Sequence, residues 1–194
     1  MRVLTALSLI FFTAACKPKQ EITTTVAPVE KCTEIKWITI QEAEKLNKEN
    51  PKKVFIDLYT DWCGYCRIMD SKTFSDPKIK EYLCTNFYTV KFNAERTDTI
   101  SFNGDTLVNL GVPFGKRTAH QFASQYGSTP NGIGYPTSVF FNEKNQIIQN
   151  LPGYYNAEQF LICLKYINEE HYKTKSLETY YNEEINKTDS IHGK

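Results

Sequence analysis

Apolar residues occur along the chain in short runs separated by stretches with helical spacing, and this alternation predicts strands interleaved with helices. The segment KKVFIDLY, residues 52–59, is a nearly continuous apolar run between polar residues, which is typical of a strand buried on both faces. Shorter or partly alternating runs at residues 35–38 and 87–95 predict two more strands. The segments PTSVFF and QIIQNL, joined by the polar turn NEKN, predict a further pair.

Helix signals fall between the early strands. Thr39 and Glu42 have the spacing of a capping box, so we expect a helix over residues 40–50 that ends before a proline. Asp76 precedes Pro77, and this pair predicts the N-cap and first position of another helix. The cysteine motif WCGYC lies directly after the buried strand and begins a helix of its own.

The second half of the chain carries weaker signals. An Asn-Gly turn predicts a hairpin over residues 99–109, and residues 116–127 are expected to form a short helix stopped by glycine. Another helix is expected from Asn156 onward. Residues 170–194 show apolar residues at four-residue spacing, which is compatible either with an amphipathic helix or with a solvated tail.

The order of these elements predicts an α/β sheet in one domain with tails, which the length of 194 residues allows. A hydrophobic fraction of 41% is enough for a packed core. The net charge of +1 offers no basic surplus for nucleic acid. The three histidines, His120, His171 and His192, are far apart in the sequence and form no metal-ligand pattern.

The N-terminus predicts export. One positive charge and a short apolar run over residues 1–15 indicate a signal peptide, because the run is too short to span a bilayer comfortably. The ending TAAC resembles a bacterial lipobox, although Thr13 stands where leucine is usual, and predicts a lipid on Cys16. The alternative is an ordinary signal peptide cut near Ala15. Residues 16–33 then hold the lipidated cysteine and a solvated tether.

Cys63 and Cys66 form a C-x-x-C motif for which three interpretations exist. A zinc site needs a second close pair of ligands, which the chain does not supply. A structural disulfide would close a very small loop and gain little entropy. A redox couple is favoured, because a cysteine at a helix N-terminus is stabilised as the thiolate that attacks disulfides. Cys66, one turn later, is placed to resolve the mixed disulfide.

The remaining cysteines, Cys32, Cys84 and Cys163, are not expected to belong to the redox couple. Cys84 and Cys163 lie in predicted helices, where a free cysteine behaves as a small apolar residue, so we expect buried inert thiols. Cys32 lies outside the predicted core and could pair in an oxidising compartment. Because the number of cysteines besides Cys16 is odd, at least one is unpaired or pairs between molecules.

Two segments resemble a known family. VFIDLYTDWCGYC resembles the active-site strand and helix start of the thioredoxin superfamily, and GYPTSVFF resembles its second signature. The run DLYTDWCGYCRIMDSKTFSDPKI resembles more closely the C-terminal domain of the thiol:disulfide interchange protein DsbD and lipid-anchored bacterial thioredoxin family proteins. The resemblance implies a thioredoxin fold over residues 34–168, with a central mixed β-sheet flanked by helices. The chain departs from a minimal thioredoxin by an expected insertion over residues 96–134, before the cis-proline strand, and an expected helical extension over residues 169–194.

The resemblance implies roles for individual residues. Cys63 would attack and Cys66 would resolve, while Asp57 would be the buried acid that takes the proton from Cys66, since desolvation raises a carboxyl pKa. Lys91 matches a family lysine beside this acid. The alternatives are an Asp57 that caps nearby amides and a Lys91 that faces solvent.

Further implied positions surround the cysteines. Pro136 matches the family's cis-proline, and the inserted residues 96–134 are expected to form a flap around the substrate groove with GVPFGKR as its mobile part. Gly64 and Tyr65 replace the commonest Gly-Pro pair in the active-site loop and are expected to change the redox poise. Substrate contacts are implied for Trp62, Tyr135, Pro136 and Thr137.

The predicted function is therefore a thiol:disulfide oxidoreductase of the bacterial cell envelope, working as a disulfide reductase through the Cys63–Cys66 couple and no other cofactor. The expected partners are protein disulfide substrates and a membrane thiol electron donor, with no nucleic acid. The lipid on Cys16 would anchor the chain facing the periplasm. The alternatives are a disulfide isomerase or oxidase, or a non-catalytic binding lipoprotein on a thioredoxin scaffold.

Overall fold

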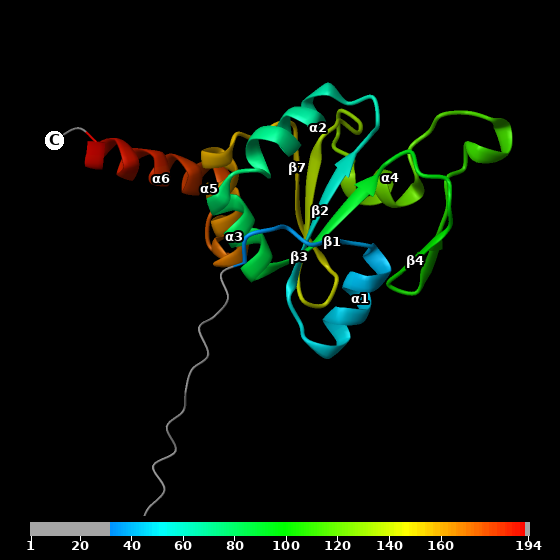
Figure 1. Cartoon of the computed structure of the whole chain (residues 1–194), viewed down its shortest axis with the longest axis horizontal. Coiled ribbons are helices and arrows are strands. Elements are labelled where there is room, and N and C mark those ends of the chain that lie inside the picture. Colours follow the sequence, from blue (N-terminus) through cyan, green and yellow to red (C-terminus); the bar gives the residue numbers. More distant parts are fainter. Residues whose placement is uncertain (1–31, 193–194) are drawn as a thin grey trace, which may run out of the picture. The chain divides into compact units, whose positions relative to one another are not determined.

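A computed structural model describes residues 32–192, so the predicted signal peptide and Cys16 lie outside the described residues. A mixed sheet of five strands forms its centre, in the order β1-β3-β2-β6-β7 (Figure 1). Strands β1, β2 and β3 are parallel, while β6 runs antiparallel to β2 and β7 antiparallel to β6. The strand bounds are Trp37–Ile38 for β1, Lys53–Tyr59 for β2, Phe87–Asn93 for β3, Thr137–Phe141 for β6 and Ile147–Pro152 for β7.

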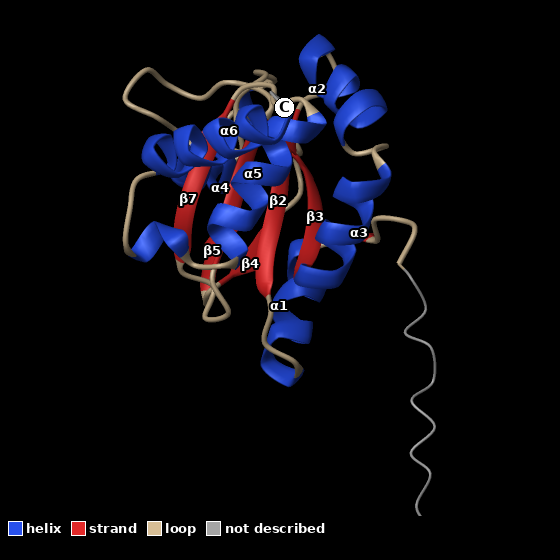
Figure 2. Cartoon of the chain, turned by 90° about the vertical axis from the view of Figure 1, so that its left-hand side faces the viewer, coloured by secondary structure: helices blue, strands red, loops and turns tan. Residues whose placement is uncertain are grey.

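Helices cover both faces of the sheet. Helices α1 (Ile40–Glu49) and α4 (Gln121–Gly127) pack on one face, against apolar residues of β2, β3 and β6. Helices α3 (Pro77–Asn86) and α5 (Ala157–Asn168) pack on the other, and α5 crosses in front of the sheet in Figure 2. This layered arrangement confirms the α/β class predicted from the sequence.

Strand β2 is buried on both faces, as its apolar run predicts. Ile56 and Leu58 belong to the core beneath α1 and α4, whereas Phe55 belongs to the core beneath α3 and α5. Because successive strand residues point to opposite faces, Asp57 lies on the same face as Phe55. An ionisable group is thereby placed inside an otherwise apolar layer.

The helix starts agree with the sequence signals. The Glu42 backbone N–H donates to Thr39 Oγ1 at 3.2 Å and the Thr39 N–H donates to Glu42 Oε2 at 2.7 Å, which is the predicted capping box. Asp76 accepts from the backbone N–H groups of Lys78 and Ile79 at the start of α3. These hydrogen bonds satisfy helix donors that have no partner inside the helix.

The insertion contains the predicted hairpin, with β4 at Ile100–Phe102 and β5 at Asp105–Leu107. Asn103 and Gly104 have φ of 54° and 88°, as a tight turn between strands requires. The hairpin tip contacts the β6–β7 turn, because the Asn103 amide donates to the Asn145 carbonyl at 2.9 Å. That turn is at the end of the sheet opposite the C-terminus of β2, so the hairpin does not form the expected flap around the cysteines.

The helix expected over residues 116–127 is shorter and begins at Gln121. The Lys116 N–H donates to the Gly111 carbonyl at 3.1 Å and closes a loop instead of a helical turn. The His120 ring accepts from the Phe122 N–H at 3.1 Å and caps the helix. A side-chain cap therefore fixes the helix start five residues after the beginning of the expected segment, and residues 116–120 are loop.

The C-terminal extension is helical. A 3-10 turn, His171–Lys173, leads into α6, which spans Leu177–His192. Leu177, Tyr181 and Ile185 pack against the core beneath α3 and α5, so the helical alternative predicted from their spacing is confirmed over the solvated tail. Within the described part of the chain, no helix has the length and apolar character needed to cross a bilayer.

A second disulfide joins Cys32 to Cys84, near the C-terminal end of α3. The expectation that Cys84 is an inert buried thiol is therefore wrong, because the segment before β1 runs back to α3 and brings Cys32 within reach. The two Cα atoms lie 6.1 Å apart. Cys163 is buried and free, as expected.

Candidate active site

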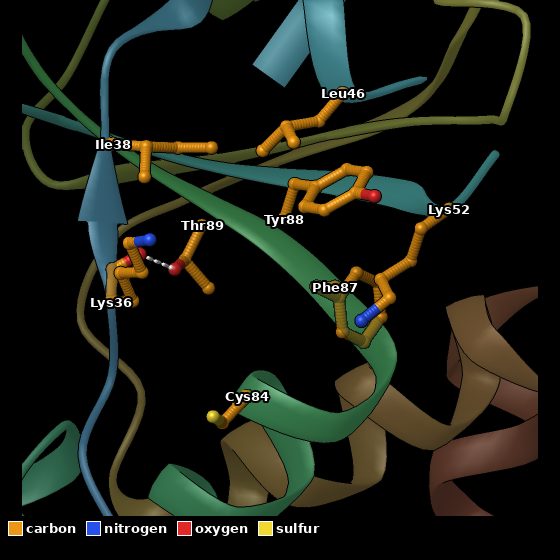
Figure 3. A pocket seen from close by; sticks show the side chains of 8 residues that line it. All are labelled: Lys36, Ile38, Leu46, Lys52, Cys84, Phe87, Tyr88 and Thr89. Carbon is orange, nitrogen blue, oxygen red and sulfur yellow. Dashed lines mark hydrogen bonds between the residues drawn. The ribbon is translucent and has the colours of Figure 1, made fainter. Parts of the chain in front are cut away.

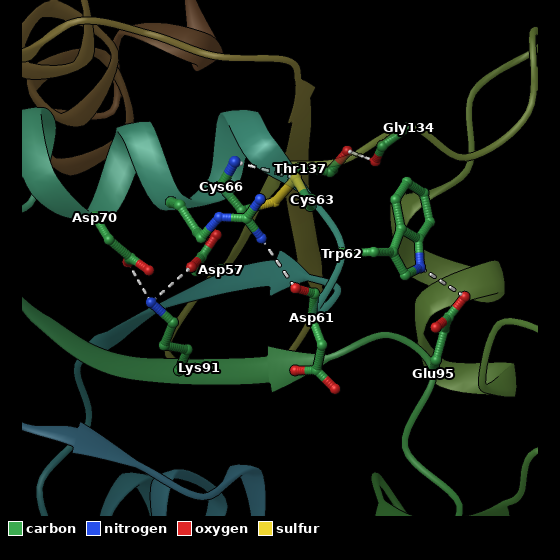
Figure 4. Close-up of a disulfide and its surroundings, with 11 residues drawn as sticks. Asp57, Asp61, Trp62, Cys63, Cys66, Asp70, Lys91, Glu95, Gly134 and Thr137 are labelled. Carbon is green, nitrogen blue, oxygen red and sulfur yellow. Dashed lines mark hydrogen bonds and ion pairs between the residues drawn. A yellow bond between two sulfur atoms is a disulfide. The ribbon is translucent and has the colours of Figure 1, made fainter.

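The cysteine motif lies at the C-terminal end of β2, where Cys63 and Cys66 form a disulfide (Figure 4). Cys63 is the N-cap of helix α2, Gly64–Ile68, and its Sγ accepts a hydrogen bond from the Cys66 N–H at 3.0 Å. Each cysteine is only 4% exposed. The sequence predicted this position at the junction of a buried strand and a helix.

This position favours thiolate chemistry at Cys63. The helix dipole and the unpaired N–H groups of the first turn stabilise a negative charge at the N-cap. The Cys66 N–H already points at the Cys63 sulfur and can donate to a thiolate there. Cys66, inside the first turn, lacks this advantage, so the geometry favours the thiolate at Cys63 over one at Cys66.

Asp57 lies beneath the disulfide and is buried, with 2% of its surface exposed. Burial raises its pKa from 3.8 to about 7, an effect that the positive charge of Lys91 opposes and the negative charge of Asp70 reinforces. Its Oδ1 atom has no hydrogen-bond partner among the described residues. A carboxyl group with this pKa can accept and release a proton near neutral pH.

Lys91 faces Asp57 from the neighbouring strand, since the two residues are paired in the β2–β3 register. Its Nζ lies 3.6 Å from Asp57 Oδ2 and also forms an ion pair with Asp70. The ammonium group lies 5.3 Å from the ring centres of both Trp37 and Tyr59. The side chain is therefore held between two carboxylates and aromatic rings, and the alternative of a simply solvent-facing lysine does not describe it.

Asp70 was not singled out in the sequence. It lies in η1, a π-helical segment over Met69–Thr73 that continues from α2. Its position four residues after Cys66 was a usable signal, because residues spaced in this way share a helix face. Asp70 and Asp57 thus form ion pairs with the same lysine (Figure 4).

The Tyr135–Pro136 peptide bond is cis, which the family resemblance implied. The next residue, Thr137, pairs with Leu58 in the β2–β6 register, so the cis bond lies at the same end of the sheet as the disulfide. The Thr137 hydroxyl donates to the Gly134 carbonyl at 2.7 Å. The predicted substrate-binding segment, at the start of β6, and the cysteines, which follow β2, therefore lie at the same end of two adjacent strands.

Exposed aromatic side chains surround the disulfide. Trp62 is 56% exposed, packs edge-on against Tyr135 with 6.0 Å between ring centres, and donates its indole N–H to Glu95 at 3.1 Å. Tyr65, between the two cysteines, is 64% exposed, and its ring centre lies 6.3 Å from that of Tyr154. A partner that reaches Cys63 must contact this rim.

Glu95 was also missed in the sequence. It follows β3 and accepts a hydrogen bond from Trp62 through one oxygen and from Arg117 through the other, the latter at 2.7 Å. It thus joins the inserted loop to the rim of the disulfide. Nothing local in the sequence pairs residues so far apart.

Two further polar atoms near this site are buried without a hydrogen-bond partner within residues 32–192, namely the hydroxyl oxygens of Thr60 and Ser138. Ser138 lies opposite Asp57 in the β2–β6 register, and Thr60 precedes the cysteine motif. Unpaired buried polar groups are uncommon in folded proteins. Here they gather around Asp57 and the disulfide.

Other features of the described residues do not compete with this site. No cluster of three or more His, Cys, Asp or Glu side chains within residues 32–192 could hold a metal ion. A hollow of about 200 Å³ lies beside Cys84 (Figure 3). Its walls include Phe87 and Thr89 at the start of β3, at the opposite end of that strand from the cysteine motif.

Several known proteins are similar to this chain in sequence. Over 154 residues the chain is 29% identical to the thiol:disulfide interchange protein DsbD of Haemophilus influenzae, which covers 75% of this chain and 23% of that protein. For DsbD of Haemophilus ducreyi the identity is 29% over 123 residues, covering 62% of this chain and 18% of the relative. The chain thus spans about a quarter or less of the length of these relatives.

Solved structures agree on the fold. A thioredoxin-fold protein from Helicobacter pylori superposes with a TM-score of 0.52 at 18% identity, covering 71% of this chain and 86% of the other. The DsbH oxidoreductase gives 0.51 at 15% identity, covering 78% and 95%. Residues 40–168 match the family model of the thioredoxin-like domain, and the chain belongs to this family.

Proposed function

We propose that this chain is a thiol:disulfide oxidoreductase of the bacterial cell envelope that acts as a disulfide reductase through Cys63 and Cys66. The observation that carries the proposal is the disulfide at the N-terminus of α2 with the buried Asp57 carboxyl beneath it. The similarity to thiol:disulfide interchange proteins supports the same chemistry.

The reaction follows from the geometry. The Cys63 thiolate attacks one sulfur of a substrate disulfide, so that a mixed disulfide forms and the other substrate sulfur leaves as a thiolate. Asp57 takes the proton from the Cys66 thiol, and the Cys66 sulfur then attacks Cys63 Sγ. The Cys63–Cys66 disulfide forms, the second substrate sulfur leaves, and two electrons have passed to the substrate. A membrane thiol donor would restore the dithiol by the reverse exchange.

In a reductase, electrons pass from the Cys63–Cys66 pair to the substrate disulfide. The run of residues after the cysteines, which resembles DsbD, favours a reductase over an isomerase or an oxidase. Tyr65 stands between the cysteines and is exposed, so it can affect both partner contact and redox poise. Equilibration of the Cys63–Cys66 pair against glutathione tests the direction, because a potential near that of strong oxidants contradicts the reductase assignment.

Export and anchoring are part of the proposal. The signal-like residues 1–15 and the lipobox-like ending at Cys16 support lipid attachment with the domain facing the periplasm. The Cys32–Cys84 disulfide is compatible with this location, because such bonds persist outside the cytoplasm. Labelling with radioactive palmitate, compared between the parent chain and Cys16→Ala, tests the lipid.

The activity is tested by insulin reduction with dithiothreitol as electron donor. The parent chain is expected to accelerate the reduction, and Cys63→Ser is expected to abolish the acceleration. In Cys66→Ala, mixed disulfides on Cys63 should accumulate. If the parent chain folds but does not turn over insulin, and folded Cys66→Ala forms no adducts, the alternative is supported, a binding lipoprotein on a thioredoxin scaffold.

A further inference from the structure

Exposed large apolar side chains gather in two places on the described residues. One is the rim of the disulfide, with Trp62, Tyr65, Ile68 and Tyr154. The other is the loop between β5 and α4, where Leu110 is 63%, Val112 43% and Phe114 75% exposed. We name residues 110–117 the apolar loop. Large exposed apolar patches mark interaction sites in soluble proteins.

The base of the apolar loop is fixed by a buried side chain. Asn109 is 5% exposed and donates its amide to the carbonyls of Arg96 at 3.1 Å and Thr118 at 2.8 Å. Its Oδ1 accepts from the Gly111 N–H at 3.0 Å and from the Thr118 hydroxyl at 2.6 Å. Both ends of the loop are therefore held by one residue.

The loop tip also has a defined conformation. Val112–Phe114 is a 3-10 turn that contains Pro113, and Gly115 ends it with φ of 64°. At Gly111 a Cβ atom would lie 2.1 Å from Thr118 Oγ1, so only glycine allows this close approach. A surface held in its binding conformation loses less entropy when a partner binds.

Hydrogen bonds connect one end of the apolar loop to the rim of the disulfide. Arg117, at the end of the loop, donates to Glu95, and Glu95 in turn accepts from Trp62 beside Cys63. A disulfide can exchange with Cys63 only if its chain lies over this rim. The end of the apolar loop at Arg117 is therefore joined to this rim through Glu95.

We propose that the apolar loop is a second contact site for polypeptide substrates, which binds apolar side chains that flank the disulfide exchanged at Cys63. This inference rests on the proposed function. The loop would favour protein disulfides over small ones, because only a polypeptide is long enough to contact both Cys63 and the loop. Its effect would appear in KM and not in the chemistry of the cysteines.

The test compares a protein disulfide with a small one. The double variant Leu110→Ser/Phe114→Ser is assayed with insulin and with oxidised glutathione, alongside Ile147→Ser as the matched control. Ile147 is 47% exposed on β7 and belongs to neither apolar group. Urea unfolding of each variant verifies that the fold is unchanged.

The double variant is expected to raise KM for insulin about tenfold, which is the effect of losing one well-buried apolar contact. Its rate with oxidised glutathione and both rates of Ile147→Ser should equal those of the parent chain. An unchanged KM for insulin overturns the inference. An equal loss with insulin and glutathione also overturns it, because the loop would then act through the cysteines.

Other occupants of the loop give different results. Vesicles of phosphatidylglycerol that bind the parent chain but not the double variant, with insulin kinetics unchanged, would assign the loop to a membrane surface. A dimer in sedimentation that the double variant dissociates would assign it to a second copy. Both results overturn the inference. A parent chain that reduces neither disulfide contradicts the proposed function itself.

Discussion

Replacement of Asp57 by asparagine tests how the buried carboxyl group affects the free energy of unfolding. This effect is separate from the role of Asp57 in proton transfer during disulfide exchange. Burial raises the Asp57 pKa from 3.8 to about 7, so the folded chain keeps a proton that the unfolded chain loses at lower pH. Folding therefore takes up a proton between these two pH values. Asparagine has a similar shape and cannot titrate, so the variant removes this linkage.

The sign and size follow from the two pKa values. The stability associated with protonated Asp57 is fully present below pH 3.8 and is lost as pH rises towards the folded pKa of about 7. The difference is about 3 pKa units, and each unit corresponds to about 1.4 kcal/mol, so the loss approaches about 4 kcal/mol above pH 7. Relative to the parent chain, Asp57→Asn should gain about this much stability between pH 4 and pH 8.

The assay is urea unfolding of both oxidised proteins at a series of pH values from 4 to 9. The free energy of unfolding of Asp57→Asn, minus that of the parent, should rise across the range and level off above the folded pKa. Asp61→Asn, at an exposed position near the same strand end, serves as the matched control. A flat difference for Asp57→Asn, or a fall with rising pH, would refute the argument.

Four further predictions use other features of the structure. Asp57→Asn should slow the second step of exchange, so that stopped-flow mixing of the reduced variant with a peptide disulfide accumulates mixed disulfide, and parent-like kinetics would contradict the proton role. Cys84→Ser should lower the free energy of unfolding, measured in urea, by about 4 kcal/mol, because the disulfide spans 52 positions. Cys32→Ser should cause the same loss, and unequal losses would mean that the two cysteines act separately. Burial raises the pKa of Cys163 to about 12, so iodoacetamide at pH 8 should label it only in urea, and labelling of the native chain would count against its burial. Phe55→Ala should cost about 3–5 kcal/mol in urea, because the Phe55 ring is fully buried among four other aromatic rings, and a loss below about 1 kcal/mol would show that the core closes around the cavity.

Local features of the fold were readable from the sequence. The capping box at Thr39, the Asp76-Pro77 start of α3 and the Asn103-Gly104 turn each depend on hydrogen bonds or backbone angles within a few residues. The placement of Cys63 at a helix N-terminus after a buried strand has the same origin, since the run before it and the helix after it are both local patterns. The cis bond at Pro136 came from family resemblance and not from its own sequence signal.

Contacts between residues far apart in the sequence could not be predicted, because they depend on which distant segments meet in the folded chain. Lys91 contacts both Asp57 and Asp70 only because β3 pairs with β2 while η1 passes over that face of the sheet. Cys32 reaches Cys84 across 52 positions, and Glu95 joins Trp62 to Arg117. The sequence by itself determined the elements and the reactive cysteine pair. Tertiary structure decided the charge environment beneath that pair, because burial and long-range contacts set the pKa of Asp57, and no local pattern encodes them.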